Sequence, residues 1–477
     1  MLVSKIEKLF PLNDHFLAKK FQAKEEFFNE EGYQICAWFA IGWCRMSRII
    51  PANVGQLRLV PSNPGCWLPD DHPVRCFSEM VESELDVSAF VGSRVGSSKH
   101  GRPSYDPVML LNIVLYGYMV GLHSSREIER ACVERLDFRF LTGGLTPSFS
   151  TITKFRADHS SALAALFQQS VSIAVRDELV AVKDVAFDGT KVLANASKHK
   201  AMSYERMCDK VQALHSEIEE RKSERRSARA GRKFEIEQDL EFKRERLANI
   251  QEHKFALEDE RMAQTGKQPK AKDQRNFTDP DSRIMKQGSG FEQCYNAQAA
   301  VDKRSQIIVA TYVTQAVNDK QQLEPLVEKF LEQVGVLPDR GMADSGFFSE
   351  AVLKSLKEKY GTTEWLLSPG RLAHGSQYGT SPRGRIPCDI SVADLMRRRL
   401  HTKAGRAAYA QRKAIVEPVF GQIKEASLDF HRFSFRGLKK VKDEWLLVCA
   451  VHNLLKVIRQ RQSVARSRSP AINRQAA

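Results

Sequence analysis

Three carboxylates stand out in the sequence because of the segments that carry them. Asp188 follows the apolar run VAF, Asp344 follows the short run GMA, and Glu417 lies near the cations of a helical pattern. A buried carboxylate is costly unless it is paired or binds a metal. Mg²⁺ prefers oxygen ligands, commonly one or two carboxylates together with substrate phosphate. These residues could therefore hold a divalent cation, although a single Asp in an apolar strand is more often a capping or turn residue.

Asp188 and Asp344 can bind the same divalent cation if they lie on neighbouring strands. Val185, Phe187 and Val192 predict a buried strand with Asp188 at its centre, and Gly189 next to it permits a close backbone approach. Later segments predict a hairpin of two strands, a helix, a strand ending at Asp344, another helix and a last strand. The order β-β-β-α-β-α-β, with antiparallel strands before parallel ones, predicts an α/β domain with the mixed sheet of the RNase H fold.

A helix predicted over residues 406–426 offers the third carboxylate. Its apolar residues cover one arc at about 100° per residue, and Lys413, Glu417 and Lys424 fall together beside that arc. The alternative is an ordinary Lys–Glu pair worth roughly a few tenths of a kcal/mol. Pro418 predicts that the helix starts or bends at the glutamate. Three other acidic residues near the sheet are interpreted as turn or capping residues: Asp302, Asp319 and Asp339.

Residues 201–275 are highly charged and interrupt the predicted sheet after its first strand. Apolar residues recur every three or four positions from Met207 to Ile218, and a heptad-like pattern resumes from Ile236 to Leu257. This pattern predicts an inserted hairpin of two long helices. Its cations between Arg221 and Arg232 could contact DNA, but a run of charge is more often a solvated surface.

Residues 68–175 predict an all-α, helix-turn-helix-like DNA-binding domain. Asp106 and Pro107 begin an apolar helix, a second helix follows Ser124, and a third begins after Pro147. An ordinary three-helix bundle would show the same pattern. The first turns of the third helix offer three candidate DNA contacts: Thr151, Lys154 and Arg156.

Composition narrows the classes of partner. The chain has 477 residues and 73 Lys+Arg against 58 Asp+Glu, and its net charge of +15 favours a polyanion such as nucleic acid. The nine cysteines are scattered and never spaced as CxxC, which argues against a disulfide framework or structural zinc and fits a reducing cytoplasm. No apolar run reaches the roughly 18 to 20 residues that span a bilayer.

The two ends of the chain differ in character from its centre. Residues 1–67 predict a partly irregular N-terminal extension, in which Met46 is a candidate start of translation. Residues 458–477 are basic and predict a disordered tail that adds nonspecific affinity for DNA.

Several blocks of the sequence resemble the DDE transposases of bacterial insertion sequences, which belong to the RNase H-like superfamily together with retroviral integrases. FDGTK contains Asp188, ADSGFF contains Asp344, and YAQRKAIVEPVFGQIK contains Glu417. YNAQAAVD, DPDSRIM and WLLVCAVHNLLK are similar to blocks of the branch usually numbered eleven-eighty-two. The resemblance implies that these three carboxylates are catalytic and bind Mg²⁺ or Mn²⁺, as a pair of ions.

The family signature also places a Tyr, an Arg and a Lys around the glutamate. Tyr409 and Lys424 match it, but Arg412 stands one residue further from the glutamate than expected, which puts Lys413 in its place. The resemblance implies that these four residues contact DNA.

The function implied is DNA transposition. The enzyme would bind the terminal inverted repeats of an insertion sequence, cut the element ends and join them to target DNA, with residues 179–200 and 276–457 as the catalytic domain. Its partner would be double-stranded DNA, bound by a homodimer or higher oligomer in the bacterial cytoplasm, at the nucleoid. No covalent protein–DNA intermediate is implied. Two alternatives stay open: a catalytically silent DNA-binding remnant of a mobile element, and a plain Mg²⁺-dependent nuclease.

Overall fold

The structure is a computed structural model that describes residues 64–91, 104–288, 290–370 and 384–468. Contacts divide the chain into Met1–Val60 and Pro61–Ala477, and every described residue belongs to the second unit. The predicted N-terminal extension, apart from its last four residues, lies outside the described residues, and so does Met46.

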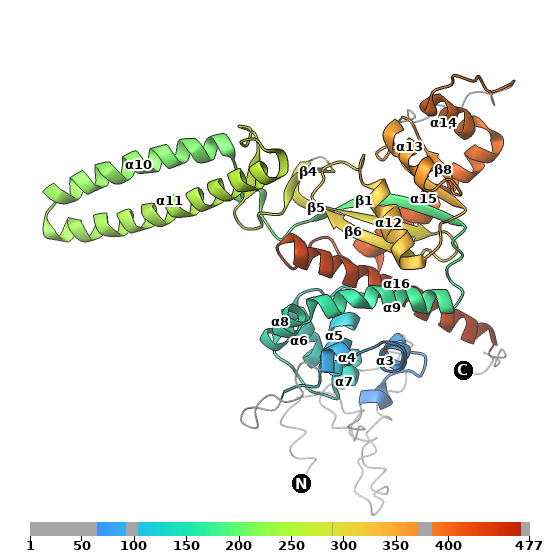
Figure 1. Cartoon of the computed structure of the whole chain (residues 1–477). Helices are drawn as coiled ribbons and strands as arrows, with labels where there is room; N and C mark the ends of the chain where they lie inside the picture. Colours follow the sequence, from blue (N-terminus) through green and yellow to red (C-terminus); the bar gives the residue numbers. More distant parts are fainter. Residues whose placement is uncertain (1–63, 92–103, 289, 371–383, 469–477) are drawn as a thin grey trace, which may run out of the picture. The chain divides into compact units, whose positions relative to one another are not determined.

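Helices fill the first part of the described chain (Figure 1). Asp106 caps α5 (Pro107–Met119), where its Oδ1 accepts from the N–H of Val108 at 3.0 Å. The N–H of Ser124 donates to Glu127 at 3.2 Å in a capping box that begins α6 (Ser125–Glu134). The other helices of this region are α3 (Pro73–Glu84), α4 (Ser88–Val91), α7 (Leu136–Thr142), α8 (Phe149–Asp158) and α9 (Ser160–Arg176), after a short 3₁₀ turn at Pro64–Trp67.

A mixed sheet follows, as the sequence predicts. Its strand order is β4-β5-β1-β7-β8, and β6 also pairs with β5. The β5–β1 and β5–β6 pairs are antiparallel, whereas β1–β7 and β7–β8 are parallel. The strands are β1 (Asp184–Leu193), β4 (Arg283–Gln287), β5 (Gly290–Asp302), β6 (Ile308–Thr314), β7 (Arg340–Ala343) and β8 (Glu364–Leu367).

The register of the central strand β1 brings two of the predicted carboxylates to neighbouring strands. Phe187 lies opposite Ala343, and this is the last pair between β1 and β7. Asp188 and Asp344 are the next residues on the two chains. Successive side chains of a strand point to opposite faces of the sheet, so Asp188 and Asp344 point to the face opposite that of Phe187 and Ala343.

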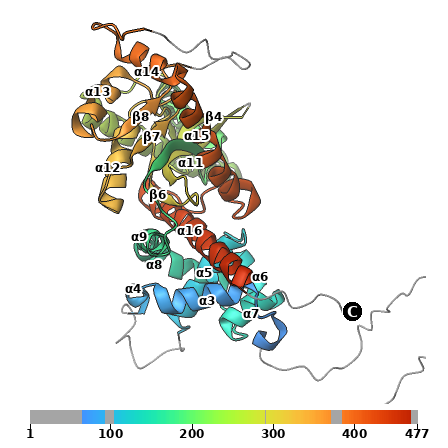
Figure 2. The same cartoon turned by 90° about the vertical axis from the view of Figure 1, so that its right-hand side faces the viewer.

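Helices cover both faces of this sheet (Figure 2). On one face, Phe187 packs against Phe330 of α12 (Leu323–Val334), with ring centroids 6.1 Å apart. On the other face, Trp445 of α16 (Leu438–Arg468) donates its indole N–H to Thr311 of β6 at 2.6 Å. The remaining helices are α13 (Glu350–Lys359), α14 (Val392–His401) and α15 (Lys403–Gly421), and α15 continues into a π-helical turn, η4 (Gln422–Ala426).

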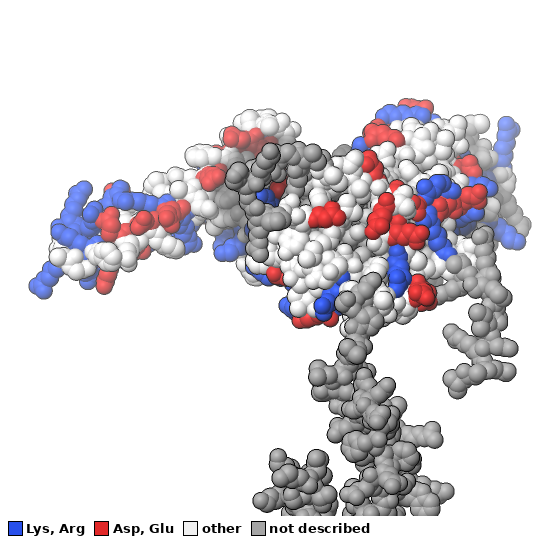
Figure 3. All heavy atoms as spheres, turned by 90° about the horizontal axis from the view of Figure 1, so that it is seen from below, with Lys and Arg blue, Asp and Glu red and all other residues white. Residues whose placement is uncertain are grey.

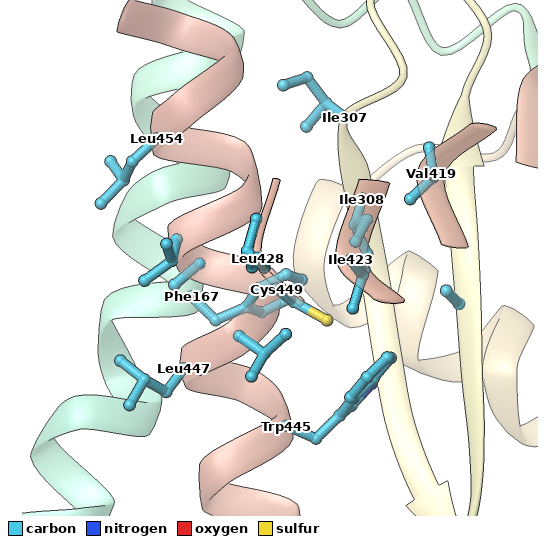
Figure 4. Packing of buried hydrophobic residues seen from close by; sticks show 14 of the residues in the cluster. Phe167, Ile307, Ile308, Val419, Ile423, Leu428, Trp445, Leu447, Cys449 and Leu454 are labelled. Atoms are coloured by element: carbon cyan, nitrogen blue, oxygen red, sulfur yellow. The ribbon is translucent and has the colours of Figure 1, made fainter. Parts of the chain in front are cut away.

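The long helix α16 joins the helical region to the sheet. It packs along α9, and one buried cluster contains Phe167 of α9, Ile308 of β6, and Trp445 and Cys449 of α16 (Figure 4). Asn453 of α16 also exchanges two hydrogen bonds with the backbone of Ile308, each 2.9 Å long. The amide therefore satisfies backbone groups at the outer edge of β6.

The C-terminal segment differs from the predicted disordered tail. Helix α16 continues to Arg468, so residues 458–468 are helical, and residues 469–477 lie outside the described residues. Arg461 donates to Asp177 at 2.7 Å and also pairs with Glu84. Acidic partners distant in the sequence thus neutralise part of this basic segment.

The predicted helical hairpin is present. Helices α10 (Tyr204–Ser227) and α11 (Ala230–Thr265) pack through an apolar cluster separate from the main core. Its buried members are Met207, Leu214, Ile218, Ile236, Leu240, Leu247, Ile250 and Leu257. At the base, β2 (Ala201–Ser203) pairs with β3 (Gln274–Asn276). Neither this small sheet nor β4 is predicted from the sequence.

Candidate active site and DNA-binding residues

Two predicted carboxylates lie where β7 ends beside β1. Asp188 Oδ1 accepts from the N–H of Gly189 at 2.8 Å, and Asp344 Oδ1 accepts from the N–H of Gly346 at 2.8 Å. The two groups interact electrostatically, since the charge of Asp344 helps to raise the pKa of Asp188. Two carboxylates this close favour a cation between or beside them.

The cation that the structure shows is Arg412. Its Nη1 donates to Asp188 Oδ2 at 2.9 Å, and the two side chains are only 9% and 19% exposed. Burial raises the pKa of Asp188 to about 6, Arg412 acts in the opposite sense, and Asp344 adds to the rise. The ion pair therefore keeps a largely buried carboxylate charged more readily than burial alone would allow.

Of the two adjacent cations Arg412 and Lys413, Arg412 is the one that contacts Asp188. Arg412 is buried and faces Asp188, whereas Lys413 is exposed. Helix α15 packs on the sheet through Arg412, Ile415, Val416 and Val419, so the flank shared by Lys413 and Glu417 is turned outward. Lys424, predicted to share this flank, is instead half-buried and donates to the carbonyl of Lys191 on β1.

Glu417 lies on α15, more than one turn after Arg412, and its side chain is exposed. No group of three or more His, Cys, Asp or Glu residues is close enough to hold a metal in the part of the chain that the structure describes. The convergence of Glu417 with Asp188 and Asp344 thus stays a prediction.

Pro418 does not end or begin the helix. Helix α15 runs through it to Gly421. A proline lacks the N–H that would bond to the carbonyl one turn earlier, and Gln306 Nε2 donates to that carbonyl, of Ala414, at 3.1 Å. A side chain from the β5–β6 turn therefore replaces the missing backbone hydrogen bond.

Two residues of the family signature hold the helix against the sheet. The hydroxyl of Tyr409 donates to the carbonyl of Ala343 at 3.2 Å, directly before Asp344. Lys424 donates to the carbonyl of Lys191 on β1 at 2.8 Å, and burial lowers its pKa. Of the four predicted DNA contacts around Glu417, Lys413 is the exposed one, whereas Tyr409 and Lys424 are half-buried and Arg412 is buried.

A further acidic residue, interpreted from the sequence as a turn or capping residue, belongs to a polar network behind the site. Asp319 Oδ1 accepts from Asn296 Nδ2 and from Gln298 Nε2, both at 2.7 Å. Both amides are buried on β5, and Gln298 Oε1 has no hydrogen-bond partner among the described residues. The network is not apparent from the sequence, because Asp319 meets the two amides of β5 only after β6 has folded back along β5.

Gly189 permits a close approach by side chains of the protein itself. A Cβ at this position would lie 2.5 Å from Gln298 Nε2 and 3.0 Å from Asp319 Oδ1. A Cβ at Gly346 would likewise lie 3.0 Å from Asp344 Oδ1 and 3.6 Å from Asp319 Oδ2. The two glycines leave room for the side chains of Gln298, Asp319 and Asp344. The backbone beside both Asp188 and Asp344 therefore lies close to Asp319.

The donor set beside β1 and β7 fits a divalent metal. Carboxylate oxygens are the ligands that Mg²⁺ and Mn²⁺ prefer. Among the described residues, none donates a hydrogen bond to Asp344 Oδ2, and Asp188 Oδ2 bonds only to a cation, which a metal could replace. Asp188 and Asp344 are the residues that would hold the ion, with Glu417 as the predicted third ligand.

Arg156, predicted to contact DNA, is instead buried inside the protein. Its guanidinium donates to the carbonyl of His123 at 2.9 Å, contacts Tyr118, and lies 3.5 Å from Glu444 of α16. The side chains of Arg156 and Glu444 are 5% and 0% exposed. An arginine with buried, acidic and aromatic partners stabilises the packing of α8 on α16 and cannot reach a nucleic acid.

The other two candidates on α8 differ in exposure. Thr151 is half-buried, and its hydroxyl lies 3.0 Å from that of Ser148, whose side chain caps the helix. Lys154 is exposed. Lys154 is therefore the one of the three predicted α8 contacts that a DNA phosphate can reach freely.

No helix in the described part of the chain has the length and apolar character needed to cross a membrane. No curated protein matches the chain. One solved structure with a weak likeness is the crystal structure of the Mos1 strand transfer complex, at 11% identity over 83% of this chain and 98% of that chain. Its TM-score of 0.16 is too low to bear on the fold.

Two family models match separate parts of the chain. Residues 63–158 match a transposase domain (DUF772), which spans the helices before α9. Residues 257–454 match a transposase DDE domain, which includes Asp344, Glu417 and the strands β4 to β8. Both matches name the same class of enzyme, and the chain belongs to the DDE transposases, the enzymes of DNA transposition.

Proposed function

We propose that this transposase binds the terminal inverted repeats of an insertion sequence, cleaves the element ends and transfers them to target DNA with Mg²⁺ or Mn²⁺. Asp188, Asp344 and Glu417 would hold the metal, as a pair of ions. The observation that carries the proposal is the position of Asp188 and Asp344 directly after the last paired residues of two neighbouring parallel strands. Helix α15, which carries Glu417, packs over them through Arg412.

The strand order supports an RNase H-like catalytic domain formed by residues 179–200 and 276–457. Antiparallel strands β1, β5 and β6 are followed by β7 and β8, which extend the sheet in parallel from β1. The helical hairpin follows the first of these strands. The short helices α6, α7 and α8 support a DNA-binding role for residues 68–175, in the manner of a helix-turn-helix, with Lys154 in reach of phosphates.

The proposed reaction consists of two balanced steps. In cleavage, a water oxygen bonds to phosphorus, the bond from phosphorus to the 3′ oxygen breaks, and a 3′ hydroxyl and a 5′ phosphate result. In joining, that hydroxyl oxygen bonds to a target phosphorus and the target 3′ oxygen leaves, so the number of phosphodiester bonds is conserved. Bound Mg²⁺ would neutralise charge on the attacking and leaving oxygens.

The residues of the chain would orient these groups. Arg412 fixes Asp188, and Tyr409 fixes the end of β7 before Asp344. The Tyr409 hydroxyl donates to a backbone carbonyl, which supports a positioning role and not that of a nucleophile. Because two element ends must be joined in concert, the active form is expected to be a homodimer or higher oligomer on DNA, in the bacterial cytoplasm at the nucleoid.

Strand transfer from a pre-cut element end tests the proposal. A duplex with a free 3′ hydroxyl at the end is incubated with a target plasmid, Mg²⁺ and either wild type or Asp188→Asn. The proposal predicts joined products with wild type and none with the variant. Cutting without joining would favour the plain nuclease. Specific binding with neither reaction would favour the silent remnant.

A further inference from the structure

The turn of the α10–α11 hairpin carries a dense basic segment. Between Arg221 and Lys233 the chain has seven Lys or Arg residues and one acidic residue, Glu224. Figure 3 shows Lys and Arg side chains gathered at the end of the hairpin. Such a density of positive charge is the electrostatic footprint of a nucleic-acid-binding surface.

Some cations of this segment are explained by the hairpin itself. Arg221 lies 2.9 Å from Asp239, and Arg225 lies 2.6 Å from Glu237, so both bridge α10 to α11. These pairs add to the buried apolar seam between the two helices. They would be expected in a hairpin that binds nothing.

Three cations at the turn lack such a role. The tip surface, defined as Arg226, Arg229 and Lys233, is exposed, and its side chains form no salt bridge with any residue that the structure describes. The charge of Arg226 contributes to the lowered pKa of Glu219 without direct contact. The apolar seam closes below them at Ile218 and Ile236. Like charges close together repel one another and lower the stability of a hairpin. Binding of an external polyanion would remove this repulsion and would account for the tip surface.

The base of the hairpin is fixed to the catalytic sheet. Glu260 of α11 accepts from Arg275 at 2.8 Å and from Arg283 of β4 at 2.6 Å, and His253 stacks on Phe277 with ring centroids 4.5 Å apart. Helix α10 has 24 residues, which corresponds to a length of about 36 Å. That length is close to one helical turn of B-DNA, about 34 Å.

We propose that the tip surface binds the phosphate backbone of duplex DNA, about one helical turn or more away from the phosphate that is cleaved. The inference rests on the proposed function, because it requires DNA at Asp188 and Asp344. The contact would add affinity without reading sequence, since phosphates carry no base identity. It would also orient the DNA relative to the sheet, because the hairpin is fixed at its base.

Binding to two lengths of DNA tests this inference. The long duplex carries an element end with flanks of about three helical turns on each side of the cleavage site, and the short duplex keeps only about half a turn on each side. Arg226→Gln/Arg229→Gln/Lys233→Gln is compared with a control of equal charge outside the hairpin, Lys329→Gln/Lys359→Gln/Arg397→Gln. The control residues are exposed but already paired, with Glu332, Glu324 and Asp394. Far-UV circular dichroism and thermal unfolding check that every variant is folded.

The tip variant is expected to lose affinity for the long duplex and to bind the short duplex like wild type. Its Kd should rise about 10- to 100-fold at moderate salt, and the slope of log K against log salt should fall by about 0.9 for each lost phosphate contact. The control should bind like wild type on both duplexes. Equal binding of tip variant and wild type to the long duplex, or an equal loss on both lengths, would overturn the inference. If wild type binds neither duplex, the proposed function fails first and the inference with it.

Discussion

Arg412 Nη1 lies 2.9 Å from Asp188 Oδ2, so a buried guanidinium contacts the carboxylate that the strand register places beside Asp344 and that we propose to bind metal. Asp344 lies on the neighbouring strand and its charge opposes ionisation of Asp188. Arg412 therefore stabilises two nearby negative charges in the folded chain. A metal that binds both carboxylates would either displace Arg412 from Asp188 or bind Asp188 together with Arg412.

Arg412→Gln should destabilise the protein and make its stability depend on divalent metal. Without the guanidinium, Asp188 stays largely buried beside Asp344 with no cation, at a cost of about 1 to 3 kcal/mol. Mg²⁺ should raise the free energy of unfolding more for the variant than for wild type, because a ligand that binds only the folded state stabilises it. Urea unfolding with and without Mg²⁺ measures both effects.

The neighbouring Lys413→Gln is the matched control, since Lys413 is exposed on the same helix turn. Its free energy of unfolding should stay within about 0.5 kcal/mol of wild type. If Arg412→Gln is no less stable than this control, Arg412 does not stabilise Asp188 in solution.

Gly189→Ala should be poorly tolerated because its Cβ would meet Gln298 Nε2 at 2.5 Å. Gln298 is buried and bonded to Asp319 and Asn296, so it cannot move aside freely. A loss of about 1 to 3 kcal/mol is expected. Gly231→Ala, where a Cβ meets nothing within 4 Å, should be neutral or stabilising by up to about 1 kcal/mol. Similar stabilities for the two variants would show that the network of Gln298, Asp319 and Asn296 rearranges to accommodate the added methyl group.

Arg156 and Lys154 lie two residues apart on α8, and their substitution should affect different properties, stability for Arg156 and DNA binding for Lys154. Arg156→Gln leaves Glu444 buried without its cation and should cost about 3 kcal/mol of stability. Lys154→Gln should leave stability within about 0.5 kcal/mol of wild type but reduce the salt slope of DNA binding by about 0.9. Thermal unfolding and DNA titrations at several salt concentrations separate the two. A stable Arg156→Gln with weakened DNA binding would reverse the assignment.

Two buried histidines should destabilise the fold in mild acid. Burial lowers the pKa of His123 and of His452 from 6.5 to about 4. Between those values the unfolded chain binds protons that the folded chain does not, so stability falls as pH drops from 6.5 towards 4. At pH 5 the loss is about 2 kcal/mol for each histidine.

The raised pKa of Asp188 acts in the opposite sense over part of this range, so the histidine effect is measured as a difference. His452→Gln should show a weaker loss of stability between pH 7 and pH 5 than wild type, whereas His199→Gln, at an exposed position, should follow wild type. Identical pH profiles for all three proteins would show that the pKa of His452 is the same in the folded and the unfolded chain.

Much of the architecture could be predicted from local patterns in the sequence. The heptad-like spacing from Met207 to Ile218 and from Ile236 to Leu257 defines the hairpin seam, because only packed helices bury residues at those intervals. The apolar runs around Asp188 and before Asp344 identify two strands that pair in the sheet. Asp106 and Ser148 predict helix starts because their side chains cap free backbone N–H groups.

Partners distant in the sequence account for what could not be predicted. Arg156 looks like an exposed residue in its helix, and its partner Glu444 is on a helix at the other end of the chain. Arg461 is ordered by Glu84 in the same way. The choice between Arg412 and Lys413 depends on which flank of α15 lies on β1, and periodicity alone does not reveal which of two adjacent flanks that is.

Cleavage of a duplex that carries the element end, measured under single-turnover conditions with Mg²⁺, tests the central claim most directly. Asp188→Asn, Asp344→Asn and Glu417→Gln are compared with wild type and with Glu425→Gln, an exposed glutamate in the turn after α15. The claim predicts that each of the first three variants is folded, binds the duplex and loses at least about a thousandfold in cleavage rate, while Glu425→Gln cuts like wild type. A folded variant of any of the three that cleaves at the wild-type rate would contradict it.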